Sequence, residues 1–103
     1  RQFRLSETTK LAMGRNRSDN EQIKNLQRPE DALLRAENFS GPMGLVSGHF
    51  NDDDLHKAAA LVASYGKGKD ESEIEVLVQQ QEESRTLTVA PMPRSEAEGY
   101  KVE

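Results

Sequence analysis

A short strand, a basic turn and the start of a helix follow one another within residues 11–26, LAMGRNRSDNEQIKNL. Residues 11–13 are apolar, as in a buried strand, and residues 14–17 then supply a flexible glycine and two cations. Ser18 is the predicted N-cap of the helix, because Glu21 lies at the capping-box spacing. Such a turn exposes backbone N–H groups beside positive charge, so it can bind an anion. The alternative interpretation is an ordinary turn whose arginines only increase solubility.

The remaining elements follow from periodicity and turn residues. Period-two alternation and short apolar runs predict strands at residues 2–5, 10–13, 31–36, 43–46, 74–78 and 85–90. Three antiparallel pairs are expected: strand 2–5 with 10–13, strand 31–36 with 43–46, and strand 74–78 with 85–90. A first helix is predicted over residues 19–27, since Pro29 ends it.

The strongest helical pattern spans residues 51–65. Asn51 or Asp52 is the expected N-cap, the next two aspartates complement the helix dipole, and Gly66 is the expected C-cap. The whole chain therefore reads as α+β, roughly ββαββαββ, with a largely antiparallel sheet and two packed helices. Residues 1–93 are expected to form one domain, and residues 94–103 to be a disordered tail.

Composition limits the possible classes. Only 34% of the chain is hydrophobic, and the sequence shows neither an apolar run of membrane-spanning length nor a secretory signal, so no membrane partner is expected. It has no cysteine, which excludes disulfides and thiolate chemistry and agrees with a cytoplasmic location. Because the first residue is Arg1, the chain is interpreted as a fragment of a longer protein.

Charge is distributed unevenly along the chain. Residues 1–28 carry seven cations against three acids, whereas the rest of the chain carries seven against fifteen. This asymmetry indicates an anionic partner for the basic part. Aromatic residues are only 5% of the chain, so nucleic-acid recognition is expected to rest on phosphate and sugar contacts more than on base stacking.

Two further motifs are not interpreted as functional sites. Asp52 and His56 are one helical turn apart, as metal ligands can be, but a helix cap beside an ordinary histidine is the preferred interpretation. The glycines of the basic stretch 66–69 follow a helix instead of a strand, so a P-loop is rejected, and a basic loop near a phosphate backbone stays the minor alternative. No nucleophile or acid–base constellation is recognisable, so the fragment is predicted to be non-catalytic, with no cofactor or metal of its own.

Residues 10–78 resemble the RNA-binding domain of the NFACT proteins, NFACT-R. The matching motifs, in order, are Gly14-Arg15-Asn16, Asn20, Asp31, Phe39-Ser40-Gly41-Pro42, Ala58-Ala59-Ala60 and Ala63-Ser64-Tyr65. The family's Trp-x-His after the matching aspartate is absent, because Ala32, Leu33 and Leu34 stand there. The chain is most similar to the variant at the C-terminus of PP-loop proteins described as tRNA 2-thiouridylases or tRNA (5-methylaminomethyl-2-thiouridylate)-methyltransferases.

The resemblance implies an RNA-binding, and specifically tRNA-binding, accessory domain of a tRNA-modifying transferase. Its partners would be tRNA or another structured RNA and the catalytic domain of the same chain, whose missing N-terminal part would hold ATP. The expected RNA contacts are Arg15, Asn16, Arg17 and Asn20, flanked by Arg4, Lys10 and Lys24. The alternative is a structural or dimerising module that binds no RNA.

Overall fold

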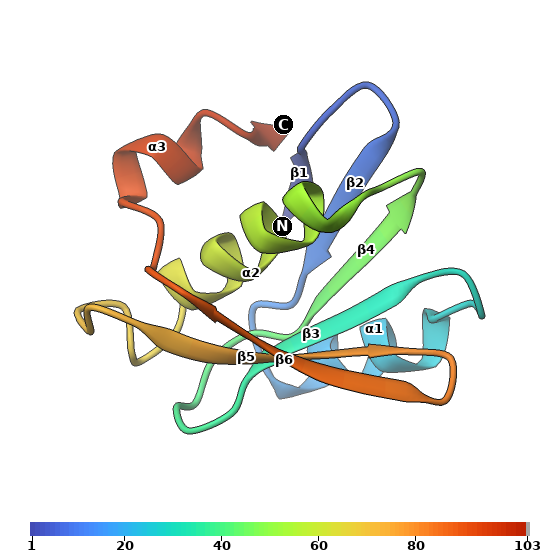
Figure 1. Cartoon of the computed structure of the whole chain (residues 1–103), viewed down its shortest axis with the longest axis horizontal. Helices are drawn as coiled ribbons and strands as arrows, with labels where there is room; N and C mark the ends of the chain where they lie inside the picture. The colour runs from blue at the N-terminus through green and yellow to red at the C-terminus, as the bar shows by residue number, and fades with distance from the viewer. Residues whose placement is uncertain (103) are drawn as a thin grey trace.

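A twisted antiparallel sheet forms the centre of the computed structural model, which describes residues 1–102 (Figure 1). Its seven strands lie in the order β6-β5-β3-β4-β2-β1-β7. The strands are β1 (Gln2–Arg4), β2 (Thr9–Met13), β3 (Ala32–Ala36), β4 (Gly44–Gly48), β5 (Ile74–Gln80), β6 (Glu83–Val89) and β7 (Lys101–Val102). The helices are α1 (Arg17–Leu26), α2 (Asp52–Ser64) and α3 (Arg94–Glu98). The predicted α+β fold with an antiparallel sheet is therefore confirmed.

The larger core lies between α2 and one face of the sheet. Alternate strand residues point to this face, including Leu11, Leu34 and Val76, all fully buried. They pack against the apolar side of α2, whose alanines Ala58 and Ala59 let the helix approach the strands closely. Val62, near the C-terminus of α2, lies against Gly44 at the start of β4, and Gly44 is opposite Met13 at the end of β2.

A smaller core lies on the other face, under α1. Ile23 of α1 packs against Leu33 of β3 and Leu45 of β4, and Ala12 and Met43 border the cluster. Figure 1 shows α1 and α2 on opposite sides of the sheet. The alternation of side chains along each strand therefore supplies both cores, one on each face.

The three predicted strand pairs are present. β1 and β2 form the first hairpin, with Phe3 opposite Leu11, and β5 and β6 form the last, with Val76 opposite Leu87. β3 and β4 also pair antiparallel on either side of the Gly-Pro loop. β3 lies between β4 and β5, so it links the two halves of the sheet.

Two predicted helix ends need correction. α1 begins earlier than expected, because the extended residue Asn16 and not Ser18 is its N-cap. The carboxylate at the third helical position is then Asp19, so Glu21 takes no part in a capping box. At the end of α2 the C-cap is Tyr65, directly before the expected Gly66. At its start, Asn51 is the N-cap, which is one of the two residues that the sequence predicts.

Residues 94–102 contain α3 and β7 in place of the expected disordered tail, whose last residue lies outside the described part of the chain. Ala97 is completely buried, the N–H of Arg4 donates to the carbonyl of Tyr100 at 2.9 Å, and β7 pairs with β1. These three contacts attach residues 94–102 to the rest of the domain, although the segment has few apolar residues. Within residues 1–102, no helix combines the length and hydropathy needed to span a membrane.

Candidate nucleic-acid interface

The turn between β2 and α1 is locked by a close approach at Gly14. The N–H of Gly14 donates to the carbonyl of Met43 at 3.0 Å, and the N–H of Met43 donates to the side-chain oxygen of Asn20 at 3.0 Å. A Cβ atom at Gly14 would clash with that same oxygen. Glycine is required here because the Asn20 side chain occupies the space of a side chain at Gly14.

The start of α1 combines a cap with an ion pair. The Asn16 side chain accepts from the N–H of Asp19 at 2.9 Å, and the Asp19 carboxylate accepts from both the backbone N–H (3.1 Å) and the Nε (3.2 Å) of Arg15. These hydrogen bonds, the backbone one foremost, hold the pKa of Asp19 below its usual value. The Arg15 side chain remains 67% exposed, so its guanidinium is oriented by Asp19 and still accessible.

This turn forms one wall of an open groove of about 820 Å³. The other walls are the loop before β4 and the segment after α2, which are joined by a hydrogen bond from the N–H of Lys67 to the carbonyl of Ser40 at 2.8 Å. The cationic residues that line the groove are Arg1, Arg15, Arg17, Lys67 and Lys69. Glu21 is the acidic lining residue, so the groove is strongly basic although the chain carries a net charge of −4.

Tyr65 lines this groove and packs against two arginines. The guanidinium of Arg94 lies 4.0 Å and that of Arg1 lies 4.7 Å from the centre of its ring, and Phe3 meets the ring edge-on with centroids 5.6 Å apart. The Tyr65 hydroxyl is buried without a hydrogen-bond partner among the described residues. Cation–π contact with Tyr65 therefore orders two arginines from opposite ends of the chain at one position.

The seven predicted contact residues divide into two groups. Arg15, Asn16, Arg17 and Asn20 all line the groove. Arg4, Lys10 and Lys24 do not line it. Arg4 and Lys10 are opposite each other beside the turn of the β1–β2 hairpin, and Lys24 is in the last turn of α1. The structure thus brings the four core residues together and separates the three flanking ones from them.

The sequence did not single out Arg1, Tyr65, Lys67 and Lys69 as a group with the turn. The two lysines carried a weak signal as a basic glycine-containing loop, which does follow a helix and precede a strand. Arg1 carries no local signal, and the sequence places Tyr65 only in a helical pattern and a family motif, neither of which indicates a groove. Their place in the groove depends on contacts between segments far apart in sequence.

The Asp52 carboxylate and the His56 ring each contact a different group. The Asp52 carboxylate accepts from Arg85 at 2.7 Å, and this hydrogen bond with its charge attraction lowers the pKa of Asp52. His56 Nδ1 lies 2.9 Å from the backbone carbonyl oxygen of Asp52, so its contact is with the backbone and not with the carboxylate. Among residues 1–102, no three His, Cys, Asp or Glu side chains are grouped to hold a metal ion.

The fold and the groove define a small α+β domain with a basic surface suited to a polyanion. The sequence model of the family described as the NFACT protein RNA binding domain matches residues 1–101. The chain therefore belongs to this family, which confirms that part of the resemblance.

A solved structure shares the fold. The C-terminal part of the fibronectin/fibrinogen-binding protein from Streptococcus suis superimposes with a TM-score of 0.86 at 16% sequence identity. The match covers 98% of this chain and 49% of that one, so the chain spans about half the length of the solved structure. No curated protein matches the sequence significantly.

Proposed function

We propose that this chain binds RNA in the basic groove at the β2–α1 turn. The observation that carries the proposal is the convergence of five cationic side chains, from three separate segments of an acidic chain, on one open groove. Membership of the NFACT RNA-binding family supports RNA as the polyanion. Like charges gathered on one surface repel each other, and bound phosphates compensate this repulsion.

The groove cations are available for phosphates to different degrees. Among the described residues, the side chains of Arg17, Lys67 and Lys69 have no ion-pair partner, and Arg15 is held by Asp19 with its guanidinium largely exposed. Lysines provide point charges, whereas arginines can bind a phosphate through two N–H groups. Such contacts position RNA without reading its sequence.

We further propose that the domain presents tRNA, or another structured RNA, to a catalytic domain of the same chain in a cytoplasmic tRNA-thiolating protein. The resemblance to the C-terminal variant found in these proteins supports this role, and ATP would bind in the preceding part of the parent. The test is to alter the groove in the full-length protein and to measure 2-thiouridine in bulk tRNA. Unchanged thiolation would contradict the role in modification and leave RNA binding to be judged separately.

RNA binding itself is tested by two matched double variants. Arg15→Ala with Arg17→Ala is expected to weaken binding to bulk tRNA at least about tenfold and to reduce the slope of log affinity against log salt by about two. The control is Arg4→Ala with Lys10→Ala, which removes the same number of cations outside the groove and is expected to change affinity less than about threefold. Fluorescence anisotropy at several salt concentrations gives both quantities.

Two results would contradict the proposal. Equal effects of the two double variants would mean that charge alone, and not the groove, attracts RNA. No binding at low salt, together with a mass that rises with protein concentration in sedimentation, would favour the alternative of a structural or dimerising module.

A further inference from the structure

A second cavity extends the basic groove. Residues 35–39 line it, and it shares Asn20, Ser40, Gly41 and Met43 with the basic groove. Its volume is about 420 Å³, and both cavities are open to solvent. The two cavities therefore adjoin, and together we call them the channel, which has a basic half and a second half that differs in chemistry.

The second half contains an exposed aromatic ring, that of Phe39. This side chain is 37% exposed, although most other large apolar residues in the described chain are buried. A Cβ atom at Gly68 would lie 2.8 Å from two carbons of the ring, so the ring rests on the backbone between Lys67 and Lys69. The segment after α2 therefore supports the Phe39 ring through Gly68 and also carries two cations of the groove, Lys67 and Lys69.

The polar groups around Phe39 suit a nucleobase better than a phosphate. Asn38 and Arg35 line the same cavity and supply an amide and a guanidinium, which can hydrogen-bond base edges. Glu37 is also present, and its carboxylate accepts from the Thr86 hydroxyl at 2.6 Å. A carboxylate repels phosphate, so the backbone of a bound strand is favoured at the basic half.

We propose that the channel selects single-stranded RNA, with an unpaired base stacked on Phe39 and its neighbouring phosphates on Arg15, Arg17, Lys67 and Lys69. Aromatic side chains stack on bases whose faces are exposed, and bases in a duplex are covered by their neighbours. The inference rests on the proposed RNA-binding function and adds to it the strandedness of the ligand. In a structured RNA, the segment that fits is a loop, a bulge or a free end.

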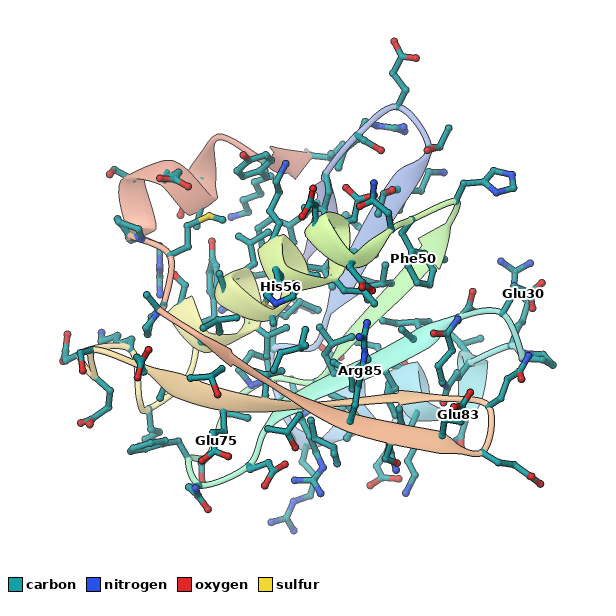
Figure 2. The ribbon with its side chains drawn as sticks, in the orientation of Figure 1. Glu30, Phe50, His56, Glu75, Glu83 and Arg85 are labelled. Atoms are coloured by element: carbon teal, nitrogen blue, oxygen red, sulfur yellow. The ribbon has the colours of Figure 1, made fainter. Side chains whose placement is uncertain are left out.

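The test compares two RNA probes of equal length, a single strand of mixed, unstructured sequence and a duplex. The chain is expected to bind the single strand more tightly. Phe39→Leu, which keeps an apolar side chain against Gly68, is expected to weaken binding of the single strand about 5- to 10-fold and to leave binding of the duplex unchanged. Phe50→Leu is the matched control, since Phe50 lies on the connection between β4 and α2 (Figure 2), outside both cavities, and is expected to change neither affinity.

A fluorescent reporter makes the test independent of the stability of Phe39→Leu. In Phe39→Trp the single strand should quench tryptophan emission, because a stacked base contacts the indole ring, and the duplex should not. Quenching by neither RNA, or equal affinity of Phe39→Leu and the unaltered chain for the single strand, would overturn the inference. If Arg15→Ala with Arg17→Ala still weakened binding in that case, the proposed RNA-binding groove would stand; no binding of either probe would overturn both proposals.

Discussion

The β2–α1 and β4–α2 connections are built alike and differ in what surrounds them. Each leads from a strand through a glycine to an asparagine that caps a helix. Gly14 leaves room for the Asn20 side chain, and Gly48, at a φ of 93°, leaves room for the carbonyl of Thr8. In both places the backbone passes too close to another group for a Cβ atom to fit.

The caps match as well. Asn16 and Asn51 each accept from the N–H three residues later, Asp19 and Asp54, at 2.9 Å. Asp54 completes a capping box by accepting from the N–H of the cap residue, Asn51. Asp19 instead accepts from the N–H of Arg15, which directly precedes the cap residue Asn16. Both helix starts thus satisfy their first N–H groups with the same side-chain chemistry.

The surroundings of the two starts are opposite in charge. α1 begins between Arg15 and Arg17 and faces Lys67 and Lys69 across the groove, whereas α2 begins with the aspartates 52–54. The exposed amides and the dipole of a helix start favour an anion in both cases, but the neighbouring carboxylates cancel this at α2. A capped helix start is therefore expected to bind phosphate only where other segments supply cations.

The glycines should give the largest difference between the two connections. Gly48→Ala is expected to lower the free energy of unfolding by about 3 kcal/mol, because it combines a positive φ with a clash against backbone. Gly14→Ala is expected to cost about 1.5 kcal/mol, since its clash is with a side chain that can turn away from Met43, and also to weaken RNA binding. Urea denaturation and RNA titration check the two effects.

Gly99→Ala is the control for this comparison. The nearest atom to a Cβ there is the carbonyl of Glu96 at 3.2 Å, and the φ of Gly99 is −65°, so the change in stability should stay within about 0.5 kcal/mol. If Gly14→Ala bound RNA as tightly as the unaltered chain, the turn geometry would not matter for the groove.

Substitutions at the two N-caps should have smaller effects on stability than those at the glycines, and they should separate stability from RNA binding. Asn51→Ala and Asn16→Ala are each expected to cost about 1 kcal/mol of unfolding free energy. Asn51→Asp and Asn16→Asp keep a capping oxygen and should be nearly neutral for stability, but Asn16→Asp adds a negative charge to the groove. It is therefore expected to weaken RNA binding about threefold to tenfold, whereas Asn51→Asp leaves binding unchanged; the reverse order of affinities would place the RNA at the start of α2.

The two aspartates with lowered pKa should respond differently to loss of their arginines. In Arg85→Ala, the pKa of Asp52 is expected to return to near its usual value, because Arg85 supplies the main stabilisation of the carboxylate. In Arg15→Ala, the pKa of Asp19 is expected to rise only part of the way, because the backbone N–H of residue 15 still donates to it. NMR titration of the side-chain carboxyl carbons measures both values, and a full return at Asp19 would contradict the leading role of the backbone bond.

The same shifts set the direction of the pH dependence. A carboxyl group with a lowered pKa in the folded protein stabilises it fully above the unfolded value of about 3.8. This stability is lost as the pH falls through the lowered folded pKa. Urea unfolding curves should therefore move to lower midpoints below about pH 4, and by less in the Arg85→Ala variant than in the unaltered chain.

Much of the fold follows from local patterns in the sequence. Alternation at Ile74, Val76 and Val78 predicts β5, and Pro29 predicts the end of α1. A cap at Asn51 or Asp52 predicts the start of α2. These signals work because strand period, proline geometry and capping each depend on a few consecutive residues. The spacing from Ser18 to Glu21 predicts an N-cap of α1 at Ser18. Asn16 and Asp19 have the same spacing, and the approach of Asn20 to Gly14 supports the earlier start.

Local sequence patterns are sufficient to predict the α+β class, the hairpins, the two main helices and the basic turn at residues 14–17. Three features become visible only in the folded chain: β7 pairs with β1, Arg1 and Arg94 meet on Tyr65, and Lys67 and Lys69 line the same groove as the turn. The physical reason is that these contacts join residues far apart in the chain. Their positions follow from how α2 and the strands bury their apolar faces together, which no single stretch of residues specifies.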